Sequence, residues 1–165
     1  MGFADETYQR GCEIAVVIVC RCQLEIVAKV IKGRSHKTLR RIHFSKLKDS
    51  DRRLVANLLA EESILALFVS VRGRQTVARS ECWRRVVPPL VKLGVVALAI
   101  EQVGDGAKAR DRRDIRNALM TIDQESRFTY DHEDPVGKPM LWAADAWCAG
   151  AGGAWRARIA TILYR

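Results

Sequence analysis

Near its start the chain carries an uninterrupted run of apolar, mostly β-branched residues, Ile14 to Cys20. The run begins soon after Gly11 and ends at Arg21, and it is far shorter than the roughly 20 residues of a membrane-spanning helix. A run of this length, bounded by a glycine and a charge, predicts a buried β-strand. Because the short segment 3–7 precedes it across a turn, we expect the chain to open with a β-hairpin.

Strand-like and helix-like segments alternate along the rest of the chain. Apolar residues at helical spacing predict helices, and short β-branched runs predict strands. The expected strands span residues 3–7, 13–20, 63–71, 95–101 and 127–130. The expected helices span residues 24–31, a segment that begins at Asp49 or Ser50, 77–93, 111–123 and 141–149, and a last helix forms the C-terminal segment after a break at 150–153. Pro88 and Pro89 are expected to break or kink the helix over 77–93. This order predicts one domain over residues 1–165, an α/β fold with a mixed five-stranded sheet and helices on both faces.

Basic residues outnumber acidic ones, with 28 Lys and Arg against 19 Asp and Glu and a net charge of +9. A surplus of this sign attracts polyanions and speeds their encounter, so nucleic acid is the partner that we expect. An acidic protein partner, or a contribution to solubility alone, would explain the same balance. No membrane partner is expected, because no apolar stretch is long enough to span a bilayer.

The cysteines and the first residues bear on the location of the protein. Five cysteines without a Cys-x-x-Cys spacing indicate neither a disulfide framework nor a zinc ribbon, and we expect buried free thiols in a reducing compartment. Asp5 and Glu6 precede the first apolar run, where a secretory signal would carry basic residues. A cytoplasmic location is therefore expected.

A basic segment follows the first expected helix. Its residues expected to contact phosphate groups are Arg34, Lys37, Arg40, Arg41 and Lys46. A flexible basic loop can follow a nucleic-acid backbone. A solvated surface loop without a ligand is the alternative interpretation.

Three acids lie within apolar segments: Asp5 on the first strand, Glu101 at the end of the fourth, and Asp145 in the helix over 141–149. Burial of a carboxylate is costly unless the group is paired, hydrogen-bonded or bound to a cation. If strand ends and a helix bring the three together, they form an oxygen-rich site for Mg²⁺ or Mn²⁺, which can activate water and stabilise the leaving oxygen of a phosphodiester. In the alternative interpretation each acid is structural, held by a turn, an arginine or a backbone amide.

Short motifs resemble those of a known family. Phe3-Ala-Asp-Glu-Thr7 before an apolar strand resembles the Tyr-x-Asp-Glu-Ser opening of the RNase H-like family termed domain of unknown function thirty-eight-hundred. Leu141-Trp-Ala-Ala-Asp145 resembles its closing Ala-Asp element. Ile42-His-Phe-Ser-Lys46 is similar to its middle segment, and Val95 to Glu101 to its second central strand.

This resemblance implies an RNase H-like fold in which Asp5 and Asp145 match acidic site positions. Glu101 stands where an Asp is more usual in the family, and Arg41 where many relatives carry Glu, so one acid is replaced by a base. The first hypothesis is a Mg²⁺-dependent nuclease acting on DNA or RNA, with Asp5, Glu101 and Asp145 as catalytic residues and metal ligands. The second is a non-catalytic module that binds nucleic acid or a protein. The third is a homo-oligomer or a component that binds a partner through the Trp-rich segment Trp142 to Trp155.

Other residues carry weaker signals. His132 is placed in a loop before the last apolar helix, where RNase H-like nucleases can carry a histidine that assists turnover, and a solvated loop histidine is the alternative. Asp111 and Asp114 share a helix face beside several arginines and are expected to form exposed ion pairs. Trp83 is expected either to stack on an unpaired base or to lie in the core.

Overall fold

A computed structural model of the chain describes residues 1–8, 11–34, 43–50, 52, 57, 64–124, 127–150 and 161–164. In these ranges the strands are β1 (Gly2–Thr7), β2 (Gly11–Ile18), β3 (Leu65–Arg72), β4 (Ala97–Glu101), β5 (Thr129–Glu133) and β6 (Thr161–Tyr164). The helices are α1 (Leu24–Arg34), α3 (Gln75–Lys92), α4 (Asp105–Met120) and α5 (Pro139–Gly150), with a short 3₁₀ helix η1 (Phe44–Lys46).

The strands form one mixed sheet in the order β5-β4-β1-β2-β3-β6. β2 runs antiparallel to both β1 and β3, whereas β1, β4 and β5 run parallel to one another. All five expected strands are present, and the α/β class with helices on both faces is confirmed. β6 adds a short parallel strand beside β3, where a terminal helix was expected, and residues 151–160 of that expectation lie outside the described part.

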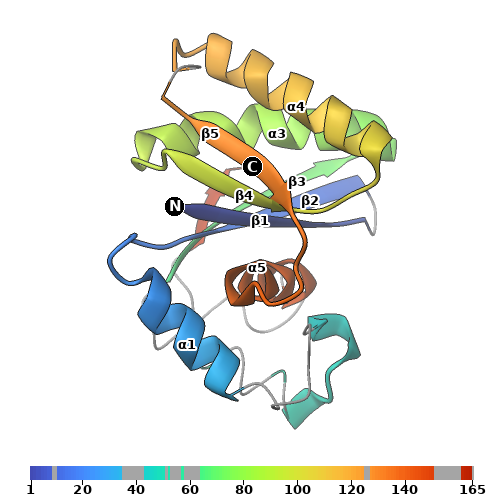
Figure 1. Cartoon of the computed structure of the whole chain (residues 1–165). Helices are drawn as coiled ribbons and strands as arrows, with labels where there is room; N and C mark the ends of the chain where they lie inside the picture. The colour runs from blue at the N-terminus through green and yellow to red at the C-terminus, as the bar shows by residue number, and fades with distance from the viewer. Residues whose placement is uncertain are drawn as a thin grey trace.

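Helices cover the sheet on both faces (Figure 1). α3 and α4 lie on one face, and α1 and α5 lie on the other. Alternate residues of β2 point to opposite faces, so Ile14 and Val16 pack under α3 and α4 while Ala15 and Val17 pack under α5. Burial on both faces is the physical reason that the run shows no alternation of apolar and polar residues.

Gly11 begins β2 at a place where no side chain fits. Its φ is +153°, and a Cβ atom there would lie 2.1 Å from the carbonyl oxygen of Val71 on the neighbouring strand. The glycine therefore permits the close pairing of β2 with β3.

Two segments differ from the local expectations: the helix at Pro88 and Pro89 is not broken, and the expected turn at 131–133 is a strand. α3 continues through Pro88 and Pro89 to Lys92, because its buried side chains include Val86, Val87 and Leu90 on either side of the prolines. Residues 131–133 belong to β5 instead of a turn, since their backbone pairs in parallel with β4.

The cysteines are not all buried as expected. Cys20 and Cys22 are exposed in the turn after β2, unlike the buried Cys12, Cys82 and Cys148.

The structure does not describe the apolar face of the helix expected after Asp49, because residues 54, 55, 58 and 59 lie outside the described residues. Among the helices that are described, none has the length and apolar character needed to cross a membrane.

Candidate active site

Asp5 lies near the carboxyl end of β1, the strand between β4 and β2. It is two residues after Phe3, which packs in the cluster under α5, so its side chain points to the same face of the sheet. Only 8% of Asp5 is exposed. Burial, together with the negative charges of Glu101, Glu6 and Asp145, raises the pKa of Asp5 from 3.8 to about 8. These neighbours act on Asp5 because they lie close to it in the fold.

Glu101 is the last residue of β4, so it lies at the same end of the strands as Asp5. Ala4 pairs with Ile100 in the parallel register of β1 and β4, so the next step along both strands brings Asp5 beside Glu101. The register between β4 and β5 pairs Glu101 with Glu133 in turn. The Glu133 carboxylate binds Lys138 at 2.9 Å. Asp5, Glu101 and Glu133 thus lie side by side near the carboxyl ends of the parallel strands β1, β4 and β5.

Asp145 approaches from α5, and its side chain is 15% exposed. One of its oxygens accepts a hydrogen bond of 2.9 Å from the backbone N–H of Phe44, and Nδ1 of His43 lies 3.9 Å from the same oxygen. The Sγ of Cys148 donates to the backbone carbonyl of Asp5 at 2.9 Å. One turn of α5 is thereby held against the end of β1, and η1 is held against Asp145.

The three acids predicted from the sequence, Asp5, Glu101 and Asp145, are thus electrostatic neighbours, and we call them the carboxylate cluster. Within the described residues, however, no group of three or more His, Cys, Asp or Glu side chains is already arranged to hold a metal ion. Mg²⁺ is commonly bound by one or two protein carboxylates, with water and substrate phosphates completing its shell. The oxygen donors of the carboxylate cluster fit that kind of site.

Glu6 points to the opposite face and belongs to a different network. It forms an ion pair with Arg79 of α3, and Arg79 also binds both oxygens of Asp111 on α4, at 2.6 and 2.7 Å. Trp83 donates to Asp111 at 2.8 Å, and Nε2 of His132 lies 2.9 Å from it. Burial opposes ionisation of Asp111, but the hydrogen bonds of Arg79 and His132 outweigh it, so the pKa of Asp111 is lowered.

This buried network corrects several expectations. Asp111 has no exposed surface, so it does not form an exposed ion pair, and Asp114 is only 9% exposed, although it does contact Arg113. His132 is a buried residue of β5 instead of a loop residue, because the strand continues to Glu133. Trp83 lies in the core, and Trp142 and Trp147 are buried too, so among the described residues the Trp-rich segment offers no exposed indole surface.

The predicted phosphate-binding residues are placed only in part. Arg34 ends α1, and Lys46 is exposed at the end of η1, two residues after the Phe44 amide that binds Asp145. Lys37, Arg40 and Arg41 lie outside the described residues.

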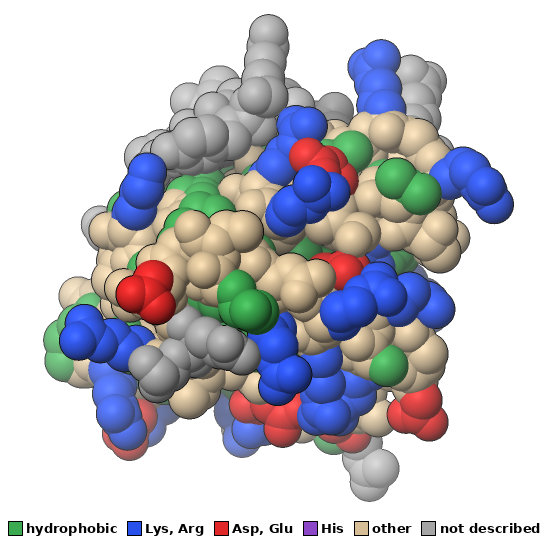
Figure 2. Space-filling view, turned by 90° about the horizontal axis from the view of Figure 1, so that it is seen from above, with side chains coloured by type: hydrophobic (Ala, Val, Ile, Leu, Met, Phe, Trp, Pro, Cys, Tyr) green, Lys and Arg blue, Asp and Glu red, His purple; other side chains and the backbone are tan. Residues whose placement is uncertain are grey.

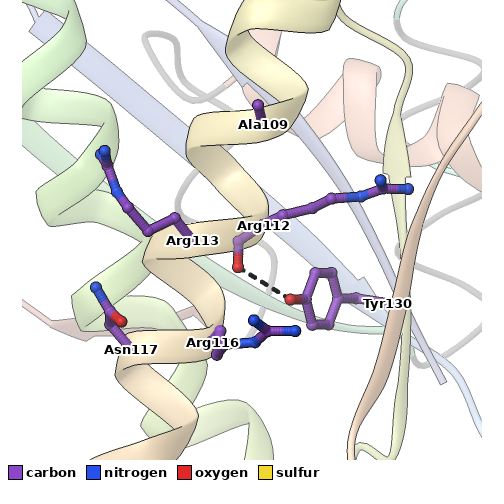
Figure 3. A pocket seen from close by; sticks show the side chains of 6 residues that line it. All are labelled: Ala109, Arg112, Arg113, Arg116, Asn117 and Tyr130. Carbon is purple, nitrogen blue, oxygen red and sulfur yellow. Dashed lines mark hydrogen bonds between the residues drawn. The ribbon is translucent and has the colours of Figure 1, made fainter.

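The sequence reasoning missed another basic surface. A groove of about 670 Å³ runs between α4 and β5, and we call it the arginine groove. It is lined by Ala109, Arg112, Arg113, Arg116, Asn117 and Tyr130. Figure 3 shows Arg112 and Arg116 on the side of α4 that faces Tyr130. The signal was present in the run Arg110 to Arg116, but those arginines were assigned to ion pairs with Asp111 and Asp114, which the fold buries.

Comparison with known proteins supports the fold alone. No family model matches the chain, and no curated protein matches it, so the resemblance to the domain-of-unknown-function family gains no support. Among solved structures the chain is similar to the complex of PCNA and RNase HII from Archaeoglobus fulgidus, with a TM-score of 0.53 and 15% sequence identity. The match covers 90% of this chain and 69% of the matched chain. The RNase H-like fold expected from the sequence is thereby supported.

Proposed function

We propose that this protein is a metal-dependent nuclease that hydrolyses phosphodiester bonds of DNA or RNA. The observation that carries the proposal is the position of Asp5, buried at the end of a central strand among the negative charges of Glu101 and Asp145. In open α/β sheets ligands bind outside the carboxyl ends of the strands, which is where these side chains lie. A solved structure with a similar fold contains an RNase HII.

Burial of Asp5, together with the negative charges of Glu101, Glu6 and Asp145, disfavours its ionised form, which is why the pKa of Asp5 is raised. In this proposal Asp5, Glu101 and Asp145 would hold Mg²⁺ or Mn²⁺, whose oxygen preference matches their chemistry. When bound, such an ion activates a water molecule and stabilises the leaving oxygen of a phosphodiester.

The chain's own residues prepare this site in two ways. The Phe44 amide and His43 orient the Asp145 carboxylate, and the contact of Cys148 with the Asp5 carbonyl fixes α5 against β1. Arg34 and Lys46, with the other basic residues of the predicted segment, would supply positive charge for the phosphate backbone. A cytoplasmic location is part of the proposal, because all five cysteines are free thiols.

A non-catalytic module that binds nucleic acid is the second candidate. It is favoured by the absence, among the described residues, of three side chains already arranged around a metal position, and by Arg41 in place of an acid. The two candidates share the fold and the partner, and they differ in whether a phosphodiester bond is broken.

Cleavage of labelled single-stranded, double-stranded and hybrid substrates with Mg²⁺ or Mn²⁺ separates the candidates. We expect metal-dependent cutting by the wild type, and a loss of at least about a hundredfold in Asp5→Asn and Asp145→Asn, equivalent to roughly 2.7 kcal/mol of transition-state stabilisation. Asp49→Asn is the matched control, because the Asp49 side chain is 84% exposed on the surface. Equal activity in all four proteins would remove the carboxylate cluster from the reaction, and binding without cutting by the wild type would support the non-catalytic module.

A further inference from the structure

The solvent-facing side of α4 is strongly positive. Between Asp105 and Met120 the helix carries five basic and three acidic residues. Two of those acids, Asp111 and Asp114, are buried against the core, whereas Arg112 and Arg113 have side chains that are 55% and 63% exposed. The fold thus buries two of the three acids of α4 and leaves these arginines exposed. Figure 2, which views the α3–α4 side of the molecule, shows Lys and Arg side chains interspersed with fewer acidic ones.

The arginine groove gathers part of this charge into a defined shape. Arg112 and Arg116 are four residues apart, so they lie on one face of α4 about 6 Å apart along the helix axis. The Tyr130 hydroxyl donates a hydrogen bond of 2.9 Å to the backbone carbonyl of Arg112, which fixes the β5 wall of the groove against α4 (Figure 3). Arg113 and Asn117 form a second column beside the first, and Asn117 offers a neutral amide.

Among the described residues, Asp131 and Asp114 border the groove and pair with its arginines. Asp131 lies 3.4 Å from Arg112 and 3.9 Å from Lys108, and Asp114 accepts from Nε of Arg113 at 3.1 Å. Asp131 is 66% exposed, so its pair with Arg112 contributes little to stability and can give way to a stronger anion. Guanidinium groups bind phosphate through two parallel hydrogen bonds, which makes an arginine cluster better suited to phosphate than a lysine cluster.

The arginine groove and the carboxylate cluster lie on opposite faces of the sheet, because Tyr130 packs with the residues under α3 and α4 whereas Asp5 shares the face of Phe3 under α5. β5 is the edge strand of the sheet, and it carries Tyr130 in the groove and Glu133 beside Glu101. Three residues along a strand span about 10 Å. A polyanion that occupied both places would have to pass around this edge strand from one face of the sheet to the other.

We infer that the arginine groove binds the phosphodiester backbone of a nucleic-acid strand, as a positioning surface separate from the carboxylate cluster. This inference shares the nucleic-acid partner with the proposed function but needs none of its chemistry. Its contacts are to phosphate, so they hold the strand in place without reading its sequence.

Binding of a labelled single-stranded oligonucleotide, measured by fluorescence anisotropy with EDTA over a range of salt concentrations, tests this inference. In the double variant Arg112→Gln/Arg116→Gln, we expect the slope of log K against log salt to fall in magnitude by roughly 1.4, and affinity near 0.1 M salt to fall by roughly tenfold to thirtyfold. Glutamine keeps the helix propensity of α4, so the fold should be retained.

The matched control is Arg84→Gln/Arg85→Gln on α3, which removes the same charge from exposed arginines that pair with Glu81. We expect its salt slope to equal that of the wild type. Equal losses in both double variants would overturn the inference, since net charge alone would then explain binding. Circular dichroism spectra of each variant test whether it is folded. The proposed nuclease activity is tested separately. If that proposal is wrong, the wild-type protein does not cleave nucleic acid, but its binding still depends on the arginine groove.

Discussion

Replacement of Arg79 by Met is expected to lower the free energy of unfolding by about 3–5 kcal/mol, because it leaves buried carboxylates without their cation. Arg79 is 5% exposed and lies between Glu6 on β1 and Asp111 on α4, binding both. Methionine fills a similar volume, so most of the loss comes from the unpaired negative charges. Urea denaturation at neutral pH, followed by circular dichroism, measures the change.

Arg84→Met is the control for that experiment. Arg84 lies on the same helix and pairs with Glu81 at 2.9 Å, but its side chain is 65% exposed, and an exposed pair contributes at most about 1 kcal/mol. A small and equal effect of both substitutions would show that the Arg79 network does not hold the α3–α4 layer on the sheet.

Metal-free protein is expected to lose stability as the pH rises from about 4 to about 8. Burial and the charges of Glu101, Glu6 and Asp145 raise the pKa of Asp5 from 3.8 to about 8, whereas unfolding restores the ordinary value. Between these values the folded protein keeps a proton that the unfolded chain releases, so the contribution of Asp5 to stability is fully present below pH 4 and is lost as the pH approaches 8. At about 1.4 kcal/mol for each pKa unit, the full loss is on the order of 5 kcal/mol.

Asp5→Asn provides the comparison for this pH dependence, since asparagine cannot ionise. Urea unfolding in EDTA at several pH values should give a falling free energy for the wild type and a much flatter profile for the variant. The lowered pKa of Asp111 acts in the opposite sense and in a different window, because its contribution is lost as the pH falls below its unfolded value near 4. Parallel profiles for wild type and Asp5→Asn would mean that Asp5 is ionised in the folded protein.

The sequence predicted most of the fold, because the buried strands are strongly apolar and the helices are periodic. Its errors lie where tertiary contacts decide the outcome. The sequence 131–133 has the composition of a turn, but pairing with β4 makes it a strand. The prolines of α3 do not end that helix, because buried residues on both sides of them keep it packed on the sheet.

The candidate site was predicted in part for a similar reason. Asp5, Glu101 and Asp145 were found because each is an acid in an apolar segment, and the fold brings them near one another. Glu133 was missed, because its place beside Glu101 follows from a register between strands that no local pattern encodes. The arginine groove was missed because the sequence does not show that Asp111 and Asp114 turn inward.

Calorimetric titration of Mn²⁺ into the metal-free protein tests most directly whether the carboxylate cluster holds a divalent cation. We predict saturable binding by the wild type, a loss of roughly tenfold or more in affinity for Asp5→Asn and for Asp145→Asn, and unchanged binding for Asp49→Asn. Absence of binding by the folded wild type, or equal affinity in all four proteins, would contradict the assignment of these acids as a metal site.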